Sequence, residues 1–126
     1  MTTVQLPARP ASAALVRRHL AQELIASEIA SSVTDDAMLI VSELITNSIR
    51  HARPLPDGSV TVAWSVSDDG VTLRVTDGGA EGRPRPRTPG PEETSGRGLA
   101  LVEALAARWG IEDSTDSTTV WAQLSL

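Results

Sequence analysis

The 126-residue chain is predicted to fold as one α+β domain, a two-layer sandwich in which about three helices cover one face of a mixed, mostly antiparallel sheet. Three observations predict this fold. Three segments carry apolar residues at helical spacing, and five shorter segments alternate polar and apolar residues as strands do. The length suffices for one two-layer core and is too short for two.

The composition excludes several classes of function. The chain has no cysteine, so it can form neither a disulfide nor a thiolate metal site. No hydrophobic run approaches the roughly 20 residues of a membrane helix, and the N-terminus lacks a signal sequence, so we expect a cytoplasmic protein without a membrane partner. The net charge of −5 and the absence of Phe and Tyr argue against direct nucleic-acid binding.

The N-terminal segment is predicted to form an edge strand and then a helix. Residues Thr2–Leu6 alternate polar and apolar side chains until Pro7 ends the strand. Pro10 opens the helix. Its apolar residues recur at helical spacing: Ala13, Ala14, Val16, Leu20, Leu24 and Ile25. Residues 17–19, Arg-Arg-His, lie on or beside its polar side, as either a solvated face or a partner-binding surface.

A long central helix is predicted from Thr34, its N-cap, to Ala52. One side is apolar and must be buried: Met38, Val41, Ile45, Ile49 and Ala52, widened by Ala37, Ile40 and Leu44. A narrower stripe is polar: Asp36, Glu43, Asn47 and Arg50. Because Glu43 and Asn47 are one turn apart, their side chains point the same way. This stripe could serve a nucleotide and its metal, or be the solvated side of an ordinary amphipathic helix.

Two strands joined by a hairpin follow the central helix. Residues Val60–Val66 and Val71–Thr76 alternate apolar and polar side chains, and an Asp-Asp-Gly sequence makes the turn between them. The same alternation places Asp77 on the face that the helices cover. Burying a carboxylate there is costly unless something hydrogen-bonds it. Gly78 and Gly79 follow at once and leave no side chain to block the close approach of a ligand.

The C-terminal part is predicted to form a loop, a helix and two closing strands. Residues 80–95 contain four prolines and three arginines and cannot form regular structure, so we interpret them as a lid within the single domain. Gly96-Arg97-Gly98 opens a helix, whose free N–H groups and positive dipole end are a natural seat for phosphate. The strands are expected at Trp109–Glu112 and Thr118–Leu126. Trp121 faces outward, either lying over small neighbours or marking a dimer surface.

Three of these features follow one another in a fixed order: Glu43-x-x-x-Asn47 on a helix, Asp77-x-Gly79 after a strand, and Gly96–Leu99 at the next helix start. In this order they resemble the N, G1 and G2 boxes of the GHKL (histidine-kinase-like) ATPases, which implies the Bergerat ATP-binding fold. The short length, the run Ser42–Ala52 and the Gly96–Leu99 box are most similar to the small anti-sigma-factor serine kinases of partner-switching systems.

The resemblance implies a role for each motif in ATP binding. Asp77 would accept the adenine amino hydrogen, and Gly79 would let the ring sit close. Asn47 would coordinate Mg²⁺ through its side-chain oxygen, and the ion would bridge the phosphates. The main chain of the third motif would wrap the phosphates: Gly96, Arg97, Gly98 and Leu99.

The resemblance also implies an activity. Glu43 would be the general base that draws a proton from the attacking hydroxyl during phosphoryl transfer. All eleven basic residues are arginine, so positive charge near the phosphates must come from arginine side chains. Arg50 and Arg53 are candidates for such contacts. The implied function is an ATP- and Mg²⁺-binding anti-sigma factor that sequesters a sigma factor and phosphorylates a serine of an anti-anti-sigma (STAS-type) partner, regulating transcription. A homodimer is also suggested by the family.

Two departures from the family pattern leave other functions open. Glu81 stands where an Asp-x-Gly-x-Gly motif has its second glycine, and residues 80–95 contain no lysine. These departures bear more on phosphoryl transfer than on ATP binding, because transfer is sensitive to displacements of about 1 Å. One alternative is a binding module without kinase activity, either gated by nucleotide or independent of it. A remoter alternative is the ATP-binding half of a histidine kinase. Such a kinase needs a helical hairpin that carries the phospho-accepting histidine, and the segment before the central helix, with one predicted helix and one histidine, His19, is too short for it.

Overall fold

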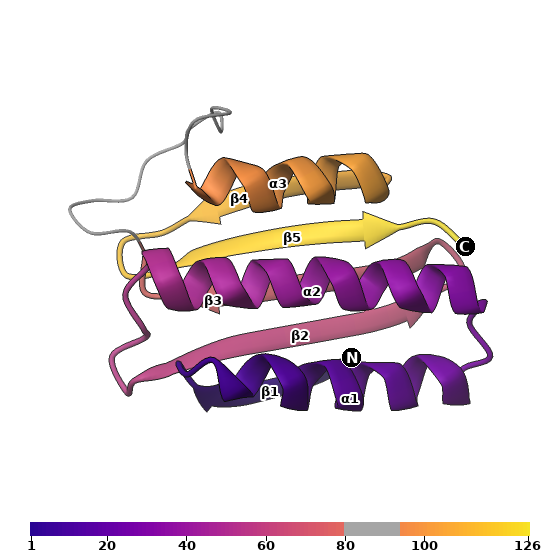
Figure 1. Ribbon diagram of the computed structural model, residues 1–126, viewed down its shortest axis with the longest axis horizontal. Coiled ribbons are helices and arrows are strands. Elements are labelled where there is room, and N and C mark those ends of the chain that lie inside the picture. Colours follow the sequence, from indigo (N-terminus) through magenta and orange to yellow (C-terminus); the bar gives the residue numbers. More distant parts are fainter. Residues whose placement is uncertain (80–93) are drawn as a thin grey trace.

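The computed structural model describes residues 1–79 and 94–126, so most of the expected lid lies outside the described residues. A five-stranded sheet of order β1-β2-β3-β5-β4 carries three helices on one face (Figure 1). The elements are β1 (Thr2–Pro7), α1 (Ala11–Ala26), α2 (Ser31–His51), β2 (Ser59–Ser67), β3 (Gly70–Asp77), α3 (Thr94–Leu105), β4 (Arg108–Asp113) and β5 (Thr118–Leu124). All four strand pairings are antiparallel. The predicted two-layer α+β fold is confirmed, except that the sheet of the described residues is entirely antiparallel and not mixed.

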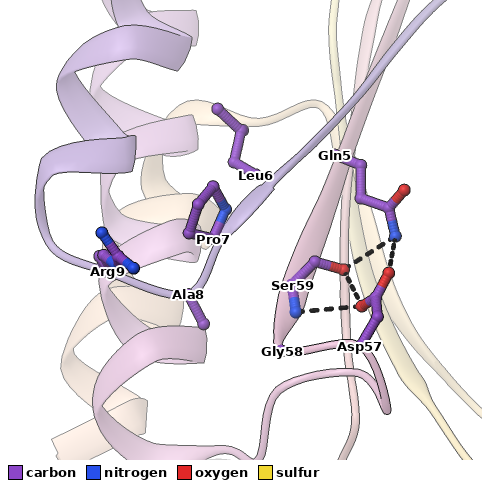
Figure 2. A pocket seen from close by; sticks show the side chains of 8 residues that line it. All are labelled: Gln5, Leu6, Pro7, Ala8, Arg9, Asp57, Gly58 and Ser59. Carbon is purple, nitrogen blue, oxygen red and sulfur yellow. Dashed lines mark hydrogen bonds between the residues drawn. The ribbon is translucent and has the colours of Figure 1, made fainter.

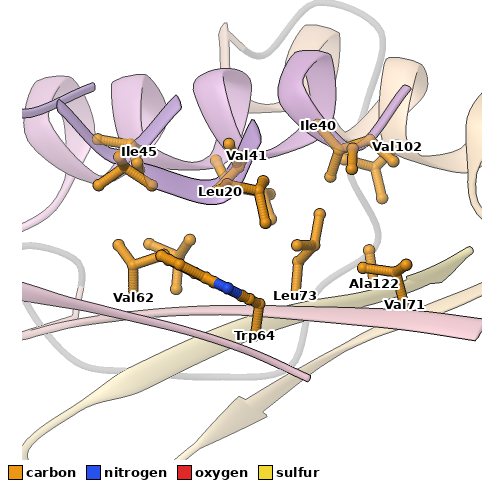
Figure 3. Close-up of a cluster of buried hydrophobic side chains, with 14 of the residues drawn as sticks. Leu20, Ile40, Val41, Ile45, Val62, Trp64, Val71, Leu73, Val102 and Ala122 are labelled. Carbon is orange, nitrogen blue, oxygen red and sulfur yellow. The ribbon is translucent and has the colours of Figure 1, made fainter. Parts of the chain in front are cut away.

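The hydrophobic core lies between the helices and the inner face of the sheet, with α2 between α1 and α3 (Figure 1). Leu20, Val41 and Ile45 reach down from α1 and α2 toward Trp64 and Leu73 of the sheet (Figure 3). All five side chains are fully buried. Alternate residues of β2 and β3 therefore face the helices, as their period of two predicts.

Helix α2 begins earlier than the sequence predicts. It starts at Ser31, and the N–H of Thr34 donates to the carbonyl oxygen of Ala30 at 3.0 Å, so Thr34 is inside the first turn and is not the N-cap. Val33 packs against the core and extends the buried face of the helix toward its N-terminus. Thr34 itself is buried, and its hydroxyl has no hydrogen-bond partner in the described part of the chain.

The buried face of helix α1 is narrower than the sequence predicts. Ala14 is exposed and Ile25 is 67% exposed, whereas Ser12 is buried and its hydroxyl donates to the Pro7 carbonyl oxygen. The reason is that α1 covers the margin of the sheet, so only a thin stripe of it meets the core. His19 is not simply solvated, because its ring lies edge-on to Trp64 with the ring centroids 5.2 Å apart.

Trp121 faces away from the helices, as predicted, and it lies over a small neighbour. Gly110 is its partner across the β4–β5 pairing, and a Cβ atom at Gly110 would lie 2.8–3.0 Å from the indole ring. The absent side chain of Gly110 therefore makes room for the ring. Dimerisation through this face stays a prediction. No helix in the described ranges is long and apolar enough to cross a membrane.

Candidate functional site

Asp77 is the last residue of β3 and points under the helix layer, as the strand alternation predicts. It pairs with Thr118 of β5 and is 7% exposed. Its Oδ1 accepts a hydrogen bond from the N–H of Gly79 at 2.8 Å. Burial raises the pKa of Asp77, the nearby Ser48 hydroxyl of α2 and the Gly79 N–H oppose this effect, and the negative charge of Asp113 adds to it.

Ser48 is the site residue that the sequence interpretation missed. It is 9% exposed and lies at the centre of the buried face of α2, one turn after Leu44 and two turns after Val41. Met38 and Ile49, which were expected on that face, are only half-buried. A polar residue in the middle of an apolar stripe was the signal, because such a side chain needs a buried partner.

The two glycines after Asp77 have different structural tasks. The N–H of Gly78 donates a hydrogen bond to the carbonyl oxygen of Arg53 at 2.7 Å. In return, the N–H of Arg53 donates to the carbonyl oxygen of Gly79 at 2.8 Å. A Cβ atom at Gly78 would lie 2.2 Å from the Pro54 carbonyl oxygen. The missing side chain of Gly78 thus makes room for the protein's own backbone. Gly79 has a φ of +89°, which favours glycine.

Glu43 and Asn47 lie on the side of α2 that turns toward α3. The neighbouring Ser42 marks the opposite side, because its hydroxyl accepts a hydrogen bond from Arg17 of α1 at 3.3 Å. The buried residues of α2 separate Ser42 from Asn47 around the helix. Glu43 and Asn47 are both half-buried, while Arg50 is exposed in the last turn. The carboxylate and carboxamide thus stay accessible from one side, as expected.

The predicted phosphate box lies at the start of α3. The helix begins at Thr94, two residues before the expected start, so Gly96-Arg97-Gly98 belong to its first two turns. Leu99 is 8% exposed and packs in the core, so only its main chain could contact a ligand. The start of α3, the end of α2 and the end of β3 lie at the same end of the molecule (Figure 1).

The described residues contain no group of three or more His, Asp or Glu side chains that could hold a metal ion. A magnesium ion at Asn47 would therefore take further ligands from the nucleotide and from water, which is the usual arrangement for Mg²⁺. Arg50 and Arg53 are both exposed, and Arg53 lies beside Gly78 and Gly79. Of the two arginines, Arg53 is thus the one placed at the proposed adenine end.

The sequence profile of the histidine kinase-like ATPase domain matches residues 6–124. The chain belongs to this family. It is 33% identical to a protein named serine-protein kinase RsbW of Listeria innocua serovar 6a, over 115 residues that cover 82% of this chain and 73% of that protein. RsbW of Listeria monocytogenes serotype 4a gives the same identity and coverage. An uncharacterised protein of Streptomyces coelicolor is 39% identical over 85 residues, which cover 64% of this chain and 76% of that protein.

The fold of this histidine kinase-like ATPase domain is also found in a solved structure. The crystal structure of the RsbU and RsbW domains of Rv1364c from Mycobacterium tuberculosis superposes with a TM-score of 0.75 and 24% sequence identity. The whole of this chain is covered, and it spans 32% of that longer chain. The Bergerat fold and the resemblance to the small serine kinases are thereby confirmed.

Proposed function

We propose that this protein binds ATP with Mg²⁺ at the end of the sheet where α2, β3 and α3 meet. Asp77 carries the proposal. An ionised carboxylate has about four acceptor positions, and the N–H of Gly79 fills one of those of Asp77, with the Ser48 hydroxyl close by. The remaining capacity suits the amino group of adenine. A buried carboxylate without such a use would be an unexplained cost to stability.

The other site residues would divide the work along the nucleotide. Asn47 would hold the magnesium ion together with the phosphates. The N–H groups at the start of α3, around Gly96, would contact the phosphates where the helix dipole is positive. Bound ATP supplies the phosphoryl group. Glu43 would take the proton from the attacking hydroxyl, since it shares one side of α2 with Asn47.

We further propose that the protein sequesters a sigma factor and phosphorylates a serine on an anti-anti-sigma (STAS-type) protein. The similarity to proteins named serine-protein kinase supports this proposal. The test is transfer of radiolabelled phosphate from ATP to candidate STAS-type partners. The native protein should label a partner serine, and Glu43→Gln should lower the rate by about 10²–10⁴-fold while leaving ATP affinity nearly unchanged. Equal transfer rates would contradict the role of Glu43.

A binding module without kinase activity is the second candidate. The observation that favours it is Glu81, in place of the second glycine of the Asp-x-Gly-x-Gly motif. A module of this kind would bind nucleotide and retain a sigma factor, with an affinity that changes between ADP and ATP, but would label no partner. Serine phosphorylation that depends on Glu43 excludes this candidate.

A further inference from the structure

The connection between α2 and β2 passes directly over the glycine loop of the proposed adenine site. We call its residues 52–54 the strap. Arg53 forms two backbone hydrogen bonds with the loop: its N–H donates to Gly79 and its carbonyl oxygen accepts from Gly78, at 2.8 and 2.7 Å. The Pro54 carbonyl oxygen occupies the space where a Cβ atom of Gly78 would lie. The strap and the loop are therefore fitted to each other through backbone atoms.

The strap contributes little to the hydrophobic core. Arg53 and Pro54 are exposed, and the turn that follows closes on itself through hydrogen bonds from Leu55 to Ser59 and from Gly58 to Leu55. Connections of this kind usually run over the surface without ordering other segments. The hydrogen bonds of Arg53 instead order Gly78 and Gly79, which directly follow Asp77.

These contacts determine the orientation of Gly79. Its carbonyl oxygen accepts from the strap, and its N–H donates to Oδ1 of Asp77. Both polar backbone groups of Gly79 are therefore engaged while the residue holds a φ of +89°. Glycine has more backbone freedom than any other residue, so a loop without these bonds would be ordered only upon binding, at a cost in affinity.

We propose that the strap, through the N–H of Arg53, is a positioning element for adenine recognition. It holds Gly79, and through Gly79 the carboxylate of Asp77, in the orientation that receives the base. This inference rests on the proposed adenine site. It adds a residue whose backbone, and not its side chain, adjusts the affinity and selectivity of that site.

The test compares Arg53→Pro with Arg53→Ala. Both variants lose the side chain, and only proline also loses the N–H. Ala52 has φ −123° and ψ 165°, an extended conformation that a following proline tolerates. Isothermal titration with Mg-ADP should give Arg53→Pro an affinity about three- to tenfold lower than Arg53→Ala, the size of one lost backbone hydrogen bond. Equal ADP affinities would overturn the proposal.

Inosine diphosphate separates positioning from general destabilisation, because its base lacks the amino group that Asp77 would recognise. A structural defect would weaken both nucleotides alike. A lost positioning contact should bring the two affinities closer together in Arg53→Pro than in Arg53→Ala. Gly78→Ala should also bring the two affinities closer together, because its Cβ atom would push the Pro54 carbonyl oxygen of the strap away from the loop. An unchanged preference for ADP over inosine diphosphate in both variants would overturn the proposal.

A readout without nucleotide distinguishes failure of the strap from failure of the proposed function. Amide hydrogen exchange at Gly79, measured by NMR on the free proteins, should be at least about tenfold faster in Arg53→Pro than in Arg53→Ala. Equal exchange rates would overturn the strap even if ADP binds. Absence of ADP binding to the native protein would overturn the adenine site and the strap's role in it, whatever the exchange rates show.

Discussion

At the scale of single residues, the buried carboxylate of Asp77 lowers the stability of the folded protein. Burial raises its pKa, so the folded protein holds this proton at pH values where the unfolded chain has lost it. The window runs from the ordinary aspartate value of about 3.9 up to the raised one. The free energy of unfolding therefore decreases as the pH rises through this window, and the loss persists at neutral pH.

Asp77→Asn should accordingly be at least as stable as the native protein at pH 7, although it should bind adenine nucleotides poorly. The advantage of the variant should shrink as the pH falls below the window, because the native carboxyl group is then neutral in both states. Urea denaturation of both proteins at a series of pH values measures this difference. A variant that is less stable than the native protein, by a margin that grows with pH, would contradict the cost assigned to Asp77.

The Ser48 hydroxyl offsets part of that cost, because it lowers the pKa of Asp77. Ser48→Ala should lower the free energy of unfolding at pH 7 by about 1–3 kcal/mol, since a buried charged acceptor loses a donor. It should also raise the pKa of Asp77 further. Ser42→Ala is the matched control, because Ser42 is on the same helix and donates nothing to the site. Equal effects of the two substitutions in urea denaturation would show that Ser48 does not support Asp77.

At the scale of elements, Glu23 fastens α1 to the edge of the sheet. Its carboxylate accepts hydrogen bonds from Thr2 of β1 at 2.8 Å and from the indole N–H of the buried Trp64 at 2.6 Å, and His19 lies 3.6 Å away. The hydrogen bond from Thr2, and to a smaller extent that from Trp64, lowers the pKa of Glu23. This stabilisation is present above the ordinary glutamate pKa of about 4.3 and is lost as the pH falls through the lowered value.

Glu23→Ala should therefore destabilise the protein by about 1 kcal/mol at pH 7, because the buried indole N–H of Trp64 loses its acceptor. The loss is no larger because the Glu23 carboxylate is itself partly hydrated. The difference from the native protein should narrow in acid. Urea denaturation followed by tryptophan fluorescence measures it, with Glu103→Ala as the control, since Glu103 is exposed on α3. A deficit that equals that of the control would argue against the fastening role.

The elements also show what local sequence can and cannot predict. Period-two alternation predicted which face of β3 is buried, and hence that Asp77 lies under the helices. The predicted start of α2 at Thr34 was wrong: the helix begins at Ser31, and the partly buried Val33 packs against the core in its first turn. The prediction that Ile25 is buried was wrong. The position of α1 at the sheet margin decides how much of the helix surface is covered, and no local sequence pattern contains that position.

At the scale of the whole molecule, the candidate site joins segments that are far apart in the chain. The family resemblance carried by the three motifs implied one nucleotide site for them, and the ends of α2 and β3 and the start of α3 do lie at the same end of the molecule (Figure 1). The strap over Gly78 could not be predicted, because it depends on the distance between the α2–β2 connection and the end of β3. At the same end of the molecule, but toward the β1 edge of the sheet, β1, Arg9 and the turn before β2 line a pocket of about 530 Å³. In this pocket Gln5 and Ser59 hydrogen-bond the carboxylate of Asp57 (Figure 2).

The most direct measurement is isothermal titration of the native protein and Asp77→Asn with a non-hydrolysable ATP analogue and Mg²⁺, beside the corresponding GTP analogue. Saturable binding of the adenine nucleotide to the native protein is expected, with an affinity at least about tenfold lower in Asp77→Asn, since a hydrogen bond to a buried carboxylate is lost. The guanine nucleotide should bind weakly to both. No binding by the native protein, or equal affinity in the variant, would contradict the assignment of Asp77 as the adenine-recognising residue.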